Sequence, residues 1–125
     1  MTTKTHKTDF GEFVFLDNHT VVAEAYEGVN IDGKKVQEAI GLIEKELPGD
    51  YAMILSRKEY YSVMPVEVYK FFASLERLKA IAIVTFRKRN LLPDNMEQMI
   101  YGGKIEKFIS KNEAHEWIKD IFRKA

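Results

Sequence analysis

Two short runs of apolar residues constrain the fold of this chain more than any other feature of its sequence. Residues 51–55 (YAMIL) and 80–84 (AIAIV) contain no charged or amide side chain, whereas a strand with one face in water alternates apolar and polar residues. Strands that are buried on both faces are typical of a parallel sheet covered by helices. The two runs therefore predict neighbouring parallel strands at the centre of an α/β fold.

Segments with the helical period lie between and around these runs. Between Asp32, which suits an N-cap, and the Pro-Gly stop at residues 48–49, apolar residues recur at helical spacing. A second helix is expected from about Pro65, because proline is tolerated in a first turn, and a third helix at residues 92–101. The apolar positions of the first two helices are Val36, Ile40, Ile43 and Leu47, then Val68, Phe71, Phe72, Leu75 and Leu78.

The last helix has the clearest local signature. Ser110 and Glu113 form a capping box, in which the hydroxyl accepts a first-turn amide and the carboxylate reaches back. Residues 105–109 before it are predicted to be a short strand. We interpret Trp117 as a core residue, because it lies on the apolar face formed by Ala114, Trp117, Ile118, Ile121 and Phe122.

The N-terminal part of the chain has the composition of a β-hairpin. Residues 12–16 and 20–26 are rich in aromatic and β-branched side chains, and residues 17–19 between them suit a turn. Residues 1–9 are polar and are expected to form a flexible tail. The predicted fold is α/β: an N-terminal hairpin, three α-β units and a C-terminal helix. This gives a mixed, mostly parallel five-stranded sheet with four helices, in one domain over residues 10–125.

Composition narrows the class of protein. The chain has 19 basic and 19 acidic side chains, whereas a protein that neutralises phosphates of nucleic acid usually has a basic excess. It has no cysteine, no apolar run near the ~18 residues that span a bilayer, and no apolar block at its start. We expect a cytoplasmic protein with no integral membrane segment and no nucleic-acid partner.

Common patterns of catalytic and metal-binding residues are missing from the sequence. His6, His19 and His115 lack the spacing of metal ligands. No glycine-rich phosphate loop and no Gly-x-Ser-x-Gly motif occurs. We therefore expect no metal, no cofactor and no enzymatic activity.

Basic residues concentrate in one part of the chain, since residues 57–90 carry 8 Lys and Arg against 3 Asp and Glu. Several follow the two apolar strands directly, and parallel strands end at the same edge of a sheet, beside the N-termini of the next helices. Such an edge suits an anion, although the same side chains are also able to point into water. The predicted ligand-binding residues are Arg57, Lys58, Arg87, Lys88 and Arg89, with Tyr60 and Tyr61 as walls. Ser56, Thr85 and Asn90 would add neutral hydrogen-bond donors.

Several segments also point to a known family. Residues 51–57 (YAMILSR), 79–85 (KAIAIVT), 105–110 (IEKFIS) and 114–118 (AHEWI) resemble the SpoIIAA-like (STAS) superfamily. The closest branch is the small single-domain bacterial proteins related to CRAL-TRIO lipid-transfer domains. The resemblance covers residues 10–123 and implies a binding or regulatory role.

The resemblance also implies a place for a phosphorylated serine. STAS regulators carry Asp-Ser-Ser-Gly-Leu-Gly between the corresponding strand and helix, where this chain has Tyr-Tyr-Ser-Val-Met-Pro at residues 60–65. The preceding Asp and the following Gly-Leu-Gly are missing. Ser62 is therefore either a phosphoacceptor or, three residues before Pro65, a helix-capping hydroxyl.

Aromatic and methionine side chains support a second hypothesis. They would line a lipid-sized cavity, form a homodimer face, or simply fill the core. These residues are Met64, Phe71, Phe72, Met96, Met99 and Ile100. The expected function is a binding or regulatory module for a protein partner or a small ligand. The alternatives are a carrier of a small apolar or anionic ligand, and an anti-sigma-antagonist-like regulator phosphorylated at Ser62.

Overall fold

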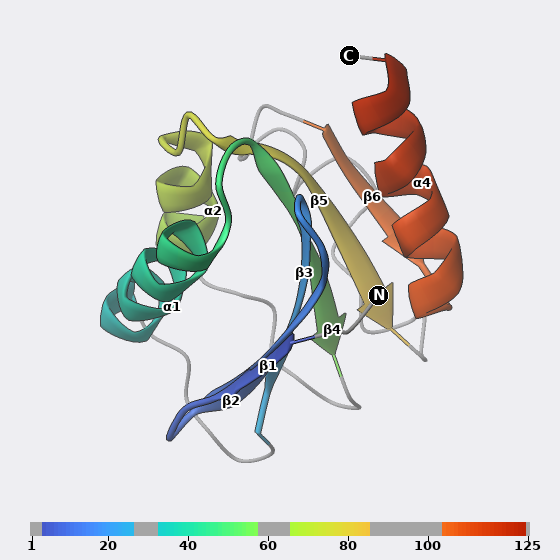
Figure 1. The fold of residues 1–125 in the computed structure, drawn as a ribbon. Coiled ribbons are helices and arrows are strands. Elements are labelled where there is room, and N and C mark those ends of the chain that lie inside the picture. The colour runs from blue at the N-terminus through green and yellow to red at the C-terminus, as the bar shows by residue number, and fades with distance from the viewer. Residues whose placement is uncertain (1–3, 27–32, 58–65, 86–103, 125) are drawn as a thin grey trace.

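The computed structural model describes residues 4–26, 33–57, 66–85 and 104–124, with only the backbone of Arg57, Val66, Glu67, Tyr69 and Thr85. Its strands are β1 (Lys4–Lys7), β2 (Gly11–Asp17), β3 (Thr20–Ala25), β4 (Tyr51–Arg57), β5 (Leu78–Thr85) and β6 (Lys104–Phe108). Its helices are α1 (Gly33–Glu46), α2 (Val66–Ala73) and α4 (Lys111–Lys124). Figure 1 shows the sheet between α1 and α2 on one side and α4 on the other.

The six strands form one mixed sheet in sequence order, from β1 to β6. β1 pairs antiparallel with β2, and β2 with β3, while β3, β4, β5 and β6 are all parallel. The turn of the hairpin is closed by Asp17, whose Oδ1 accepts the backbone amide of His19 at 2.9 Å. The predicted hairpin and the predicted, mostly parallel, sheet are therefore confirmed.

The number of strands differs from the expectation of five, because the region expected to be a flexible tail contains β1. Lys4 Nζ donates to Glu46 Oε2 at 2.7 Å, and His6 Nε2 lies 3.3 Å from Glu46 Oε1. These contacts join β1 to the end of α1, which is 40 or more residues away in the chain. The expectation of a tail is wrong for Lys4–Lys7, because this polar strand pairs with β2 from Lys7↔Glu12 to Lys4↔Phe15. The turn between the two strands is closed by the backbone amide of Thr8, which donates to the carbonyl of Gly11 at 2.8 Å. The helix expected at residues 92–101 lies outside the described residues.

The two faces of the sheet are covered by different helices. α1 connects β3 to β4 and α2 connects β4 to β5, so the chain crosses over twice in the same direction along the sheet. Successive crossovers of one hand place their helices on the same face. α4 follows the last strand and lies on the opposite face (Figure 1). The two central strands, β4 and β5, are thus buried on both sides over residues 51–55 and 80–84, as their lack of alternation predicts.

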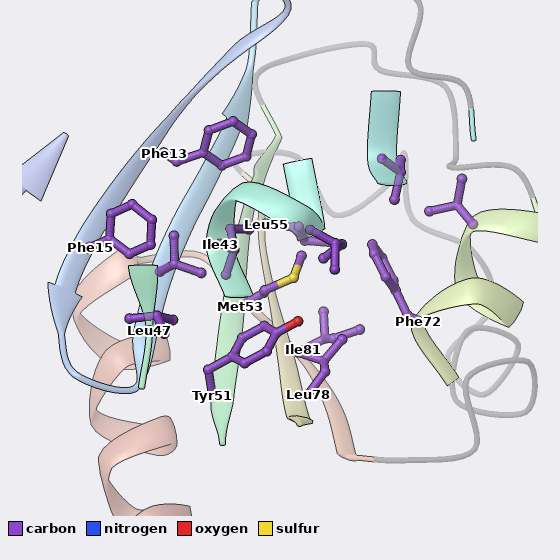
Figure 2. Packing of buried hydrophobic residues seen from close by; sticks show 14 of the residues in the cluster. Phe13, Phe15, Ile43, Leu47, Tyr51, Met53, Leu55, Phe72, Leu78 and Ile81 are labelled. Carbon is purple, nitrogen blue, oxygen red and sulfur yellow. The ribbon is translucent and has the colours of Figure 1, made fainter. Parts of the chain in front are cut away.

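The larger part of the core lies between the sheet and the α1–α2 layer. Figure 2 shows the aromatic rings of β2, aliphatic side chains of α1, the odd-numbered residues of β4, and Leu78 and Ile81 of β5 packed together. Phe72 of α2 closes this cluster and is 2% exposed. The labelled members are Phe13, Phe15, Ile43, Leu47, Tyr51, Met53, Leu55, Phe72, Leu78 and Ile81.

The face under α4 has small residues at its centre. Ala52, Ala80 and Ala82 are fully buried there, and they pack against Ala114 and Ile118 of α4. Small side chains on both elements allow a helix to approach a sheet closely. Trp117 is partly buried and its ring lies 5.5 Å from that of Phe108, so the prediction that it is a core residue is confirmed.

α2 is shorter than the helical pattern predicts. It ends at Ala73, and Ser74 closes it by donating its hydroxyl to the carbonyl of Phe71 at 2.6 Å. Leu75 follows the helix, and Leu78 is the first residue of β5, paired with Tyr51. Both leucines still pack in the same core, which is why their spacing imitates a longer helix.

Candidate functional site

The carboxyl ends of the parallel strands meet at one edge of the sheet. In the register of β3, β4 and β5, Glu24 pairs with Ser56, Ser56 with Val84, and Arg57 with Thr85. The backbones of Arg57 and Thr85 are therefore neighbours, and Arg87 is two residues further along the chain. The prediction that the two apolar strands end side by side in the same direction is confirmed.

The other predicted residues of this edge cannot be placed. Lys58, Tyr60, Tyr61, Arg87, Lys88 and Arg89 lie outside the described residues, as does Ser62, the candidate phosphoacceptor. For Arg57 the position is given by its backbone in β4. The structure thus describes the strand ends that carry the predicted anion site, but not its side chains.

Ser56 is a polar side chain of this edge that the sequence predicts as a neutral hydrogen-bond donor of the anion site. It is 6% exposed, and its Oγ has no hydrogen-bond partner among the described residues. By the alternation of β4 it lies on the same face as Ala52 and Ile54, which is the face covered by α4. A buried hydroxyl without a hydrogen-bond partner lowers the free energy of unfolding. A ligand that supplied a partner would remove this cost.

The start of α4 lies at the same level of the sheet as Ser56. Phe108 pairs with Val84, so Glu24, Ser56, Val84 and Phe108 form one row across four strands. α4 begins soon after Phe108, and the Nζ of Lys111 lies 3.4 Å from Glu24 Oε2 at the far end of this row. β3 and β6 are three strand spacings apart, about 14 Å. One lysine side chain does not span that distance, so the first turn of α4 lies over the middle of the row.

The N-cap of α4 is as predicted on its hydroxyl side. The Oγ of Ser110 accepts the amide of Glu113 at 3.2 Å, and the amide of Ala114 donates to the carbonyl of Ser110. The first turn of any helix also has amides without an intrahelical acceptor. These amides and the helix dipole favour negative charge at this position.

A second polar cluster lies at the opposite edge, where the hairpin turn meets α4. Asp17 Oδ2 lies 2.8 Å from His115 Nε2, and Asp17 Oδ1 lies 3.1 Å from His19 Nδ1. The ring of His19 stacks on that of Phe122, with centroids 4.3 Å apart, and its Nδ1 lies 3.1 Å from the Oγ1 of the buried Thr20. Sequence reasoning missed this cluster, because 98 residues separate Asp17 from His115.

The pKa of Asp17 reflects this surrounding. Burial raises it, but the hydrogen bonds from His115, from the amide of His19 and from Thr20, with the charge of His19, outweigh burial. The pKa of Asp17 therefore lies below its ordinary value of 3.8. Within the part of the chain that the structure describes, no three His, Cys, Asp or Glu side chains come together as metal ligands. The cluster is thus a polar clamp between the hairpin and α4.

Arg77 forms a third polar network, at the same edge as this clamp. Its guanidinium donates to the carbonyls of Glu44 at 3.0 Å, of Gly49 at 2.8 Å and of Leu47. It also lies 5.7 Å from the centre of the Tyr51 ring, while the Tyr51 hydroxyl donates to Glu44 Oε2 at 2.8 Å. These bonds satisfy carbonyls at the end of α1. Arg77 therefore has a structural role.

The second hypothesis of the sequence, an apolar cavity or dimer face, has two members in the described residues. Phe72 is buried in the core and Phe71 is partly buried against it. Met64, Met96, Met99 and Ile100 lie outside the described residues. What the structure describes of this set is therefore core packing.

Comparison with protein families, with curated proteins and with solved structures found no match for this chain. None of the helices in the described ranges has both the length and the apolar character needed to span a membrane. The candidate site accordingly rests on the geometry of the chain itself.

Proposed function

We propose that this chain is a non-catalytic binding or regulatory module of the STAS-like type, which binds an acidic ligand or partner segment at the carboxyl ends of β4 and β5. The observation that carries the proposal is the parallel register in which Arg57 pairs with Thr85. It brings two strand ends together, each followed in the sequence by basic residues. In open α/β sheets ligands bind outside the carboxyl ends of the strands.

The chemistry of this edge supports an anion. Arg57 and Lys58 follow β4, and Arg87, Lys88 and Arg89 come soon after β5. Guanidinium groups bind carboxylates and phosphates through paired hydrogen bonds. Ser56, buried and without a partner among the described residues, adds a hydroxyl that a ligand would satisfy.

A catalytic function has less support from the described residues. The acid–histidine pairs of Asp17 lie at the opposite edge, next to the hairpin turn. Their side chains are engaged in joining the hairpin to α4. Binding without chemistry is therefore the function that the site supports best.

The test is to compare which ligands and partners are captured by the wild-type chain, by a variant changed at this edge and by a control variant changed elsewhere. Wild-type chain and an Arg57→Gln/Arg87→Gln variant are immobilised and incubated with an extract of native cells, and bound proteins and small molecules are identified by mass spectrometry. Lys45→Gln/Lys124→Gln is the matched control, because it removes the same charge from exposed residues near the other edge. We expect acidic species on the wild type and the control, and their loss from the Arg57/Arg87 variant.

The result that contradicts the proposal is equal capture by all three proteins, or capture of nothing beyond an empty matrix. Apolar lipids retained equally by all three would favour the carrier alternative. Recovery of a serine kinase, with the mass of one phosphate lost in Ser62→Ala, would favour the phosphorylated regulator.

A further inference from the structure

The buried hydroxyl of Ser56 points to a specific subsite within the proposed binding edge. Its Oγ has no partner among the described residues, although the side chain is 6% exposed. Its neighbours in the sheet are Glu24 on β3 and Val84 on β5. A polar group held in this way is already desolvated, so a ligand atom that reaches it gains a hydrogen bond without removing water from the hydroxyl.

The element that covers Ser56 is a source of further donors. The first turn of α4 lies over the row that contains Ser56, as the contact of Lys111 with Glu24 requires. Ser110 Oγ accepts the amide of Glu113, and Ser110 O accepts that of Ala114. Earlier amides of the turn, those of Lys111 and Asn112, have no acceptor within a regular helix. The Ser56 hydroxyl, the first-turn amides of α4 and the Lys111 ammonium thus belong to the same face and the same end of the sheet.

We propose that the Ser56 hydroxyl, the first-turn amides of α4 and the Lys111 ammonium form a subsite for a carboxylate group of the ligand. The inference rests on the proposed function, because it assigns one group of the ligand that this edge binds. Oriented hydroxyl and amide donors at the positive end of a helix suit an anionic oxygen. Lys111 would share its charge between the ligand and Glu24.

The charge of the row favours a group with a single negative charge. Glu24 and Lys111 form an ion pair with a contact of 3.4 Å, so together they bring no net positive charge. The helix end adds a partial positive charge of about half a unit. The single negative charge of a monocarboxylate is closer to that partial charge than the charge of a dianion such as sulfate.

The experiment is an NMR titration of the intact chain with sodium acetate, and separately with sodium sulfate at the same ionic strength. We expect acetate to shift the backbone amides of Ser56, Lys111 and Asn112 together and saturably. We expect sulfate to shift them more weakly. Shifts spread over exposed lysines, with none at Ser56, would mean adventitious ion binding only and would overturn the inference.

Variants separate this subsite from general charge effects. Ser56→Ala should weaken acetate binding about tenfold, which corresponds to the loss of one hydrogen bond to a charged group. Lys111→Gln should weaken it as well. Lys119→Gln, on the same helix and paired with Glu116, is the matched control and should bind as the wild type does. Unchanged affinity in Ser56→Ala would overturn the subsite.

The two proposals fail in different ways. If cell-derived ligands depend on Arg57 and Arg87 but acetate does not reach Ser56, the subsite is wrong and the binding edge stands. If acetate binds at Ser56 but no captured species depends on the basic residues, the proposed function is wrong. Folding of each variant is checked by its own amide spectrum, since loss of the spectrum would invalidate that variant alone and leave Lys111→Gln as the test.

Discussion

Arg77 holds the end of α1 through bonds to main-chain carbonyls, which explains why a half-buried arginine is placed between α2 and β5. Its guanidinium reaches the carbonyl of Glu44 in the last turn of α1 and the carbonyls of Leu47 and Gly49 just after the helix. Hydrogen bonds from a charged donor contribute more than neutral ones. A planar group with five donors suits this geometry, and an ammonium does not.

Replacement of Arg77 should therefore be costly. We expect Arg77→Ala to lower the free energy of unfolding by about 2 kcal/mol, measured by urea denaturation. Arg77→Lys should recover little of this loss. Arg123→Ala, whose side chain is 71% exposed, should change stability by about 0.5 kcal/mol or less. A value for Arg77→Ala as small as that of Arg123→Ala would contradict the role given to Arg77.

Replacement of Ser56 should raise the free energy of unfolding, whereas replacement of Arg77 should lower it. In the absence of ligand, Ser56→Ala removes a buried hydroxyl that has no partner among the described residues, so we expect unfolding free energy to rise by about 1 kcal/mol. Ser74→Ala is the matched control, because the Ser74 hydroxyl donates to the carbonyl of Phe71 and its loss should be neutral or slightly destabilising. A clear loss of stability in Ser56→Ala would show that the hydroxyl is satisfied in the free protein.

At the scale of helices and strands, the elements predicted from the sequence match the structure where interactions between residues close in the chain determine them. The hairpin, the buried strands, α1 and the Ser110 cap follow from turn residues, apolar period and capping, which act over a few positions. β1 pairs with the nearby β2, but its polar residues lack the apolar alternation by which strands are recognised. Its contact with Glu46, the Arg77 network and the Asp17 cluster depend on partners about 30 to 100 residues away. No local pattern of residues 4–7 or of His115 identifies those partners.

The clamp between the hairpin and α4 predicts a dependence of stability on pH. The pKa of Asp17 is lowered in the folded state, so its contribution is complete above the ordinary value of 3.8 and is lost as pH falls through the folded pKa. At about pH 6, Asp17→Asn should lower unfolding free energy by about 1.5 kcal/mol, and the difference should shrink toward about pH 2. Urea denaturation across this range measures both values.

Asp120→Asn serves as the control for that experiment. Asp120 is 47% exposed and pairs within α4 with Lys124 at 3.0 Å, so its effect should be small throughout. If Asp17→Asn and Asp120→Asn give the same profile, the clamp does not stabilise the docking of α4.

For the whole molecule, the topology explains why one edge is suited to binding and the other to stability. All the parallel strands run toward the edge at Ser56 and Arg57, while the Arg77 network and the Asp17 cluster lie at the opposite edge. The sequence predicted the first edge because consecutive parallel strands must end together. The sequence did not predict the opposite edge, because its contacts form only when the hairpin, α1 and α4 pack together.

Hydrogen exchange of the chain before and after capture of its cellular ligand or partner tests the binding edge most directly. We predict that exchange slows at the carboxyl ends of β3, β4 and β5 and in the first turn of α4. Residues 17–20 and the end of α4 should be unaffected. Protection confined to the hairpin turn and the last turn of α4, with none around Ser56 and Arg57, would contradict the account.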